Sequence, residues 1–213
     1  MFTNSETEQQ VAEFLLQIKA IKLQPNNPFT WASGWKSPIY CDNRITLSHP
    51  TIRTYIRQQL TSAIQEAFGS VGCIAGVATA GIPQGVLVAQ EMGLPFIYVR
   101  AKAKEHGTGS LIEGEISPGQ RVVVIEDLIS TGKSSLQAVN ALRDAGYNVA
   151  GLAAIFSYGF DVATENFKEA KCPFITLSNY NALLKYAEEH NYISAADTEV
   201  LKQWRTQPST WGQ

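Results

Sequence analysis

The sequence predicts an α/β fold in which helices flank a central parallel sheet. From residue 73 onward, short apolar runs alternate with stretches whose apolar residues recur at helical spacing. This alternation is typical of parallel sheets. Residues 122–125 are consecutive β-branched side chains, which favours a strand buried on both faces. The chain of 213 residues has the length of one large domain, so we expect a single domain over residues 1–213.

The first segment, about residues 1–50, departs from this alternation, and we expect an N-terminal elaboration on the α/β core. Ser5 followed by Glu8 matches a capping box that begins a helix. Over residues 24–46, prolines and a glycine interleave with aromatic residues, which predicts short strands and turns. Pro50 suits the first turn of a second helix.

The remaining elements follow from apolar runs and from the glycines that end helices. Gly93 and Gly146 each close a predicted helix. We expect strands at residues 73–78, 95–99, 122–125, 149–156 and 174–177, and helices at 85–92, 134–145, 181–189 and 195–205.

The composition limits the classes of partner. Hydrophobic residues make up 45% of the chain and charged residues 17%, with a formal net charge of −2. This is ordinary globular composition, and the slightly acidic balance argues against a nucleic-acid partner. The three cysteines lie far apart, which favours a reducing compartment. The polar N-terminus does not resemble a signal peptide, and no apolar run approaches the roughly 20 residues that span a bilayer. We therefore expect a cytoplasmic protein without a membrane partner.

The sharpest chemical signal is the segment VVVIEDLISTGKSS at residues 122–135. A buried strand is expected to end at two acids, Glu126 and Asp127, and small polar residues then lead into a helix. Backbone N–H groups at a helix N-terminus bind phosphate, and Gly132 permits close approach. The acids would repel a phosphate but can accept hydrogen bonds from sugar hydroxyls. The segment therefore predicts a site for a phosphorylated sugar.

The residues of this segment suggest two other interpretations, a Walker A loop and a purely structural connection. Gly132, Lys133 and Ser134 match the end of a Walker A loop, but that motif requires glycine at position 127, where the chain has aspartate. The segment could also be a structural strand-to-helix connection with surface acids, although such connections seldom combine paired acids with so many small polar residues.

A second segment, residues 100–115, gathers cations and glycines after a predicted strand. Arg100, Lys102, Lys104 and His106 lie within seven residues of one another. They could clamp a polyphosphate, or they could form a solvated basic loop. Small residues at 76–85 could present N–H groups to a phosphate as well, or could form only a tight turn.

Three motifs resemble those of one family. The acid pair and its loop resemble the phosphoribosyl-pyrophosphate (PRPP) signature of type I phosphoribosyltransferases. The pattern Arg-x-x-x-Lys-x-His-Gly at residues 100–107 resembles the catalytic loop of the orotate phosphoribosyltransferases. FTWASGWKSPIYCDNR at residues 29–44 is similar to the Ser-Gly-x-x-Ser-Pro-x-Tyr signature of the same enzymes. The resemblance implies a type I phosphoribosyltransferase-like fold in which the N-terminal elaboration forms a small hood.

The resemblance also implies roles for individual residues. Arg100, Lys104 and His106 would act on the pyrophosphate, in a homodimer whose active sites are shared between subunits. Ser130 would contact orotate, and Arg44 is a candidate for holding its carboxylate, with a surface salt bridge as the alternative. Ala101 stands where the family has a lysine, so Lys102 is a candidate substitute. The implied PRPP-binding residues are Arg100, Lys104, His106, Glu126, Asp127, Leu128, Ile129, Ser130, Thr131, Gly132, Lys133 and Ser134.

The implied reaction converts orotate and PRPP to orotidine 5-monophosphate and pyrophosphate, a step of pyrimidine (UMP) biosynthesis. Mg²⁺ is the implied cofactor, held mainly by substrate oxygens, so no dedicated protein ligand set is expected. Two alternatives stay open: a purine phosphoribosyltransferase, and a PRPP-sensing RNA-binding regulator on the same fold.

Overall fold

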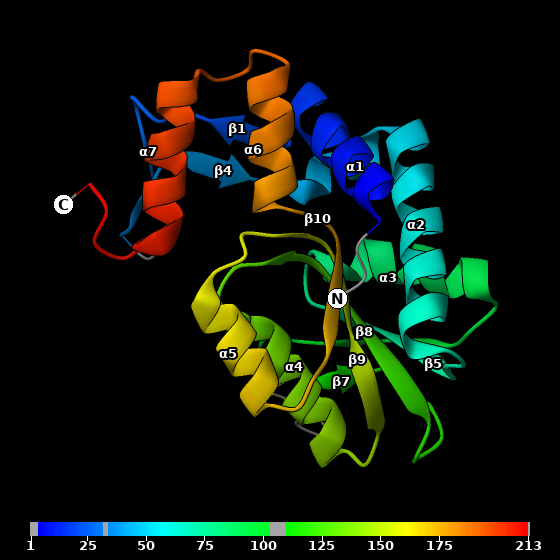
Figure 1. The fold of residues 1–213 in the computed structure, drawn as a ribbon. Coiled ribbons are helices and arrows are strands. Elements are labelled where there is room, and N and C mark those ends of the chain that lie inside the picture. Colours follow the sequence, from blue (N-terminus) through cyan, green and yellow to red (C-terminus); the bar gives the residue numbers. More distant parts are fainter. Residues whose placement is uncertain (1–3, 32–33, 103–109, 213) are drawn as a thin grey trace.

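A mostly parallel sheet with helices on both faces forms the centre of the molecule, as Figure 1 shows. The computed structural model describes residues 4–31, 34–102 and 110–212. Helices α1, α2 and α3 cover one face of the sheet, and α4 and α5 cover the other. The helix bounds are α1 Ser5–Gln17, α2 Pro50–Phe68, α3 Gly81–Met92, α4 Lys133–Asp144, α5 Asp161–Glu169, α6 Tyr180–Glu189 and α7 Ala195–Thr206.

The strand order places a reversal in the middle of the sheet. The order is β10-β9-β8-β5-β6-β7, and every described pair is parallel except β6 with β7. The chain passes from β5 outward to β6 and then returns to β8 on the other side of β5, so the connections diverge between β5 and β8. Ligands of open α/β sheets bind at such a reversal, beyond the carboxyl ends of the strands. The strand bounds are β5 Cys73–Val77, β6 Phe96–Val99, β7 Ile112–Glu113, β8 Arg121–Ile129, β9 Asn148–Ser157 and β10 Phe174–Asn179.

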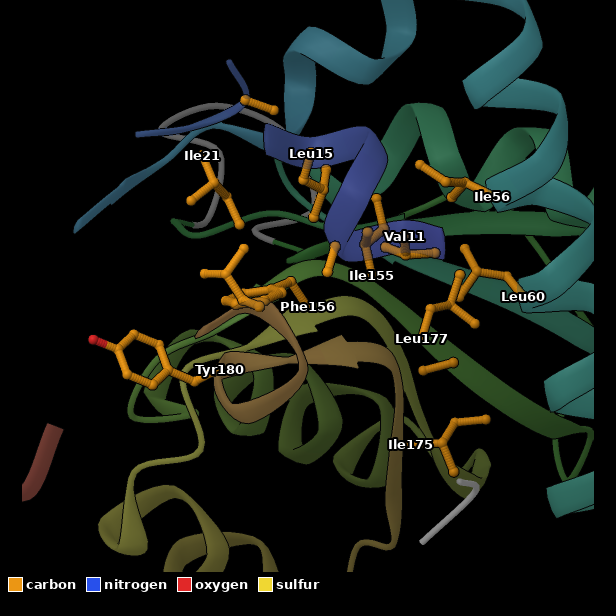
Figure 2. Close-up of a cluster of buried hydrophobic side chains, with 14 of the residues drawn as sticks. Val11, Leu15, Ile21, Ile56, Leu60, Ile155, Phe156, Ile175, Leu177 and Tyr180 are labelled. Carbon is orange, nitrogen blue, oxygen red and sulfur yellow. The ribbon is translucent and has the colours of Figure 1, made fainter. Parts of the chain in front are cut away.

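Two apolar clusters hold the helices on the sheet. The larger lies under α1 and α2, where Val11, Leu15 and Leu60 are fully buried with Ile155 of β9 (Figure 2). The smaller lies under α4 and α5 on the opposite face. Both faces of the central strands are covered, which explains why their sequences are continuous apolar runs rather than alternating ones.

The N-terminal elaboration forms a hood at the carboxyl end of the sheet. Strands β1 (Ile21–Leu23) and β4 (Ile39–Cys41) pair antiparallel, as do β2 (Phe29–Thr30) and β3 (Lys36–Ser37). A 3₁₀ helix, η1 (Asn43–Ser48), leads from the hood into α2. The indole N–H of Trp204 on α7 donates to the Lys36 carbonyl at 3.2 Å, so the last helix supports the hood.

The structure confirms the predicted fold class, but it corrects the start of α1. Asn4, and not Ser5, caps this helix, because its side-chain oxygen accepts hydrogen bonds from the N–H groups of Glu6 and Thr7. The predicted capping box of Ser5 and Glu8 was therefore wrong.

The structure also corrects elements near the site. Strand β8 does not end before the acids but continues to Ile129, because β9 pairs with it as far as Ile129 and Ser157. Helix α3 begins at Gly81 rather than near residue 85. Two elements had no predicted counterpart: α5, which buries Ala163 and Phe167 against the smaller cluster, and the two-residue strand β7.

Candidate active site

The paired acids lie where β8 outruns its neighbour β5. The last β5–β8 pair is Gly76 with Ile125, so Asp127 lies beyond the end of β5. Side chains, rather than a neighbouring strand, form hydrogen bonds with the backbone N–H and carbonyl groups of Asp127. Its N–H donates to Glu126 Oε1 at 3.1 Å, and its carbonyl accepts from Asn43 Nδ2 at 2.7 Å. Both backbone polar groups of Asp127 are therefore hydrogen-bonded.

Burial dominates the electrostatics of this acid pair. Glu126 is 6% exposed, and Ser135 Oγ donates to its Oε2 at 3.3 Å. Burial, with the adjacent Asp127 charge in second place, raises the pKa of Glu126 well above its usual value. Burial also raises the pKa of Asp127, although a hydrogen bond from Glu126 acts in the opposite direction. Glu126 therefore holds a proton more readily than an ordinary glutamate does, and a cationic or hydroxyl-rich ligand would relieve the repulsion between the two.

The loop after the acids forms a backbone cradle at the start of α4. Gly132 begins this helix with φ +78° and no side-chain cap, so a ligand can take the N–H groups of the first turn. A Cβ at Gly132 would lie 2.7 Å from the Phe167 ring. The Thr131 carbonyl accepts from Asn166 Nδ2 at 3.0 Å. Helix α5 therefore supports the loop from behind.

The two other predicted phosphate segments converge on this cradle. Gly81 packs α3 against β8 so closely that an added Cβ would overlap the Ile125 carbonyl oxygen. Ala78, Arg100 and Ser134 line one pocket of about 350 Å³, which joins the ends of β5 and β6 to α4. The Arg100 guanidinium lies 3.5 Å from Glu113 Oε1.

The remaining cations of residues 100–115 are Lys102, Lys104 and His106. Lys102 is exposed, and Lys104 and His106 lie outside the described residues. Ser134 contributes to the pocket that Arg100 lines.

A second pocket, of about 340 Å³, lies between the hood and the end of the sheet. We call it the hood pocket. Its walls are aromatic, aliphatic and hydroxyl-bearing, which suits a flat ring with polar edges. The lining residues are Thr30, Trp31, Tyr40, Cys41, Leu128, Ser130 and Tyr158. Ser130 of the predicted PRPP loop therefore also lines this pocket, and its contact with the acceptor stays a prediction.

Arg44 does not line the hood pocket. Its guanidinium makes two hydrogen bonds to Asp42, Nε to Oδ1 at 2.7 Å and Nη2 to Oδ2 at 2.9 Å. Its side chain is 61% exposed. In this structure the surface ion pair, the alternative weighed for Arg44, is formed.

Tyr158 and Asn43 were missed as site residues. Tyr158 directly follows β9, the strand beside β8, so its place at a carboxyl strand end was a usable signal. Asn43 carried no such signal, because its partner Asp127 lies 84 positions away.

The described residues contain no group of three or more His, Cys, Asp or Glu side chains that could hold a metal ion. The oxygens of Glu126 and Asp127 nevertheless fit Mg²⁺, which takes one or two carboxylates together with substrate phosphates and water. Burial is the first cause of the raised pKa values of both acids. A nearby cation would favour their ionised forms.

Comparisons with known proteins agree with this arrangement. The family described as "Phosphoribosyl transferase domain" matches residues 47–186. The orotate phosphoribosyltransferase of Phocaeicola vulgatus is 58% identical over 96% of this chain and 96% of its own. The orotate phosphoribosyltransferase structure from Aeropyrum pernix has a TM-score of 0.75 at 26% identity, covering 86% of this chain and 99% of that one. The Leishmania donovani UMP synthase has a TM-score of 0.80 at 27% identity, covering 94% of this chain, which spans 42% of that longer protein. With more than half of its length matched by the domain and nearly all of it by such a relative, the chain belongs to the orotate phosphoribosyltransferase family.

Proposed function

We propose that the chain transfers the 5-phosphoribosyl group from PRPP to orotate, which yields orotidine 5-monophosphate and pyrophosphate for pyrimidine (UMP) biosynthesis. The observation that carries the proposal is the position of Ser130. It follows the acid pair by three residues and lines the hood pocket, so the sugar site and the acceptor site meet at one loop. The 58% identity to a protein named for this activity supports the same conclusion.

In the proposed complex, the acids and the cradle hold the sugar. Glu126 and Asp127 accept hydrogen bonds from the ribose hydroxyls, and Leu128 and Ile129 carry the strand into the loop. The N–H groups and side chains of residues 130–134 bind the 5-phosphate, which the start of α4 favours. This placement leaves C1 of the ribose facing the hood pocket.

The reaction requires stabilisation of a departing pyrophosphate. Positive charge develops on the ribose ring while negative charge develops on the leaving group, so positioned cations accelerate the step. Arg100 lines the pocket beside Ser134, and we assign Lys104 and His106 of the same segment to the pyrophosphate. Mg²⁺, when bound, neutralises phosphate charge.

The hood pocket suits a flat acceptor. The rings of Trp31 and Tyr158 lie 5.4 Å apart between centroids, and Ser130 supplies a hydroxyl at the pocket wall. No general base is required, since orotate is an anion with a nucleophilic ring nitrogen. Arg44 could reach the orotate carboxylate only by exchanging its ion pair with Asp42.

The cellular setting is part of the proposal. We propose a cytoplasmic homodimer in which the segment of Lys104 serves the partner's site. Cys41, Cys73 and Cys172 are free thiols, which suits a reducing compartment. No helix among the described residues is long and apolar enough to cross a membrane.

One assay separates this function from its rivals. Pyrophosphate release should be measured with PRPP, Mg²⁺ and either orotate, adenine or hypoxanthine, beside a gel-shift assay with short RNAs. We expect pyrophosphate release with orotate as the acceptor base but not with adenine or hypoxanthine. Faster release with a purine base would establish a purine phosphoribosyltransferase. RNA binding at nanomolar protein without pyrophosphate release would establish a regulator.

A further inference from the structure

A buried chain of polar side chains connects α3 to the acid pair. Gln84 on α3 donates to Thr46 Oγ1 at 3.1 Å, and the Thr46 hydroxyl donates to the Asn43 carbonyl at 2.6 Å. The Asn43 carboxamide then donates to the Asp127 carbonyl at 2.7 Å. Gln84 is 1% exposed, and Thr46 and Asn43 are 0% exposed. Buried polar groups are costly unless paired, so these hydrogen bonds favour one arrangement of the path, although Gln84 Oε1 has no hydrogen-bond partner among the described residues.

Asn43 is the member of this hydrogen-bonded path that contacts one residue of each proposed substrate site. Its Nδ2 holds the backbone of Asp127, and its Oδ1 lies 3.3 Å from the thiol of Cys41. Cys41 lines the hood pocket, and Asp127 is one of the proposed ribose-binding acids. A carboxamide is suited to this position because it carries a donor and an acceptor on one rigid plane.

The strand geometry explains why Asp127 needs such a partner. Beyond Ile125, β8 has no pairing with β5, so the Asp127 carbonyl on that side lacks a strand donor. The amide of Asn43 takes the place of a strand N–H. Without it, a partly buried carbonyl would lose its donor, and the peptide that precedes Leu128 could rotate.

We propose that Asn43 is a positioning residue of the transfer reaction: its carboxamide orients the Asp127 backbone so that the Asp127 carboxylate meets the ribose, and it ties that orientation to the wall of the hood pocket. The inference rests on the proposed function. It assigns to η1 a part in catalysis that goes beyond connecting the hood to α2.

A double-mutant cycle tests the proposal in the full-length protein. Asn43→Leu removes the donor at nearly constant volume, and Asp127→Asn removes the carboxylate through which Asn43 is proposed to act. The kcat and KM for PRPP with orotate are measured for wild type, both single variants and the double variant. PRPP affinity by calorimetry and the melting temperature are measured for the same four proteins.

We expect Asn43→Leu to lower kcat/KM for PRPP by about tenfold to a hundredfold, the scale of a hydrogen-bond acceptor that loses its donor away from bulk water. In the Asp127→Asn background the same change should cost less than about threefold, because residues that act through one group are not additive. An equal loss in both backgrounds would show a general structural role and overturn the proposal. So would wild-type kinetics for Asn43→Leu.

A second pair of variants covers the case in which Asn43→Leu fails to fold. Thr46→Val removes the hydroxyl that holds Asn43, and Thr46→Ser keeps it. The inference predicts a smaller loss for Thr46→Val that again shrinks in the Asp127→Asn background, with recovery in Thr46→Ser. Additive losses would contradict it. Because wild type is assayed in parallel, an absence of orotate turnover there would overturn the proposed function instead.

Discussion

Gly132 combines an unusual backbone geometry with a proposed role in phosphate binding. Its φ of +78° is unfavourable for any side chain, and an added Cβ would lie 2.7 Å from the Phe167 ring. We predict that Gly132→Val abolishes PRPP binding and lowers the free energy of unfolding by at least the roughly 1–2 kcal/mol that a left-handed residue costs. Calorimetry with PRPP and chemical denaturation measure the two effects.

Gly119 provides a matched control for this substitution. It has a φ of +76°, and nothing lies within 4 Å of its hypothetical Cβ. Gly119→Ala should therefore show the backbone cost alone, with PRPP affinity unchanged. If Gly132→Val retained PRPP affinity while folded, the cradle assignment would be wrong.

Burial disfavours the charged form of Glu126. Burial raises its pKa, so its protonated form stabilises the fold at low pH, and this stability is lost as the pH rises through the folded-state pKa. Glutamine mimics the protonated acid. We predict that ligand-free Glu126→Gln melts at a higher temperature than wild type at pH 8, that the difference shrinks toward pH 5, and that PRPP affinity falls.

Thermal melts between about pH 5 and pH 8 measure this effect. Glu66→Gln, an exposed position on α2, serves as the control and should change neither stability nor affinity. A Glu126→Gln protein that melted below wild type at pH 8 would refute the assignment of a strained, buried charge.

At the scale of elements, α7 supports the walls of the hood pocket. Trp204 is fully buried, and its ring centroid lies 5.7 Å from Trp31 and 5.6 Å from Tyr158. We predict that Trp204→Ala costs about 3–5 kcal/mol of stability, as for other large-to-small core changes, and raises the KM for orotate more than the KM for PRPP. Denaturant unfolding and steady-state kinetics measure these quantities.

Trp204→Phe is the matched variant, because it keeps an aromatic ring but removes the hydrogen bond to the Lys36 carbonyl. Its stability and its KM for orotate should both lie between the values for wild type and for Trp204→Ala. Equal increases in the two KM values would show that α7 supports the whole fold and has no particular effect on the hood.

At the scale of the whole molecule, the proposed dimer shares its sites. Lys104→Ala and Gly132→Val should each be inactive alone, the first by about 10²–10³ in turnover, as for one lost transition-state donor. In mixed dimers, one site would combine an intact cradle with a partner's intact Lys104. We predict partial recovery of activity when the two proteins exchange subunits, measured by pyrophosphate release after mass spectrometry has detected heterodimers.

Lys102→Ala tests the register of the cationic segment in the same experiment. It should lose less turnover than Lys104→Ala. A larger loss would show that Lys102 replaces the lysine absent at Ala101. Heterodimers without recovered activity would contradict shared sites.

Local patterns in the sequence were enough to predict the α/β class and most strands of the sheet, and they pointed to the acid pair and the loop that follows it. These features depend on local spacing: the β-branched run at residues 122–125, the adjacent acids and the glycine that begins α4. The single-domain organisation over residues 1–213 stays a prediction, as do the roles of Lys104 and His106.

The length of β8 and the surroundings of its end depend on contacts between segments far apart in the sequence. β8 continues to Ile129 because β9 pairs with it there, and Asn43 reaches Asp127 across 84 positions of sequence. Arg44 is paired with Asp42, and Tyr158 packs against Trp31 in the lining of the hood pocket. Local patterns cannot specify such contacts, because they form between segments that become neighbours only after the hood and the helices have packed on the sheet.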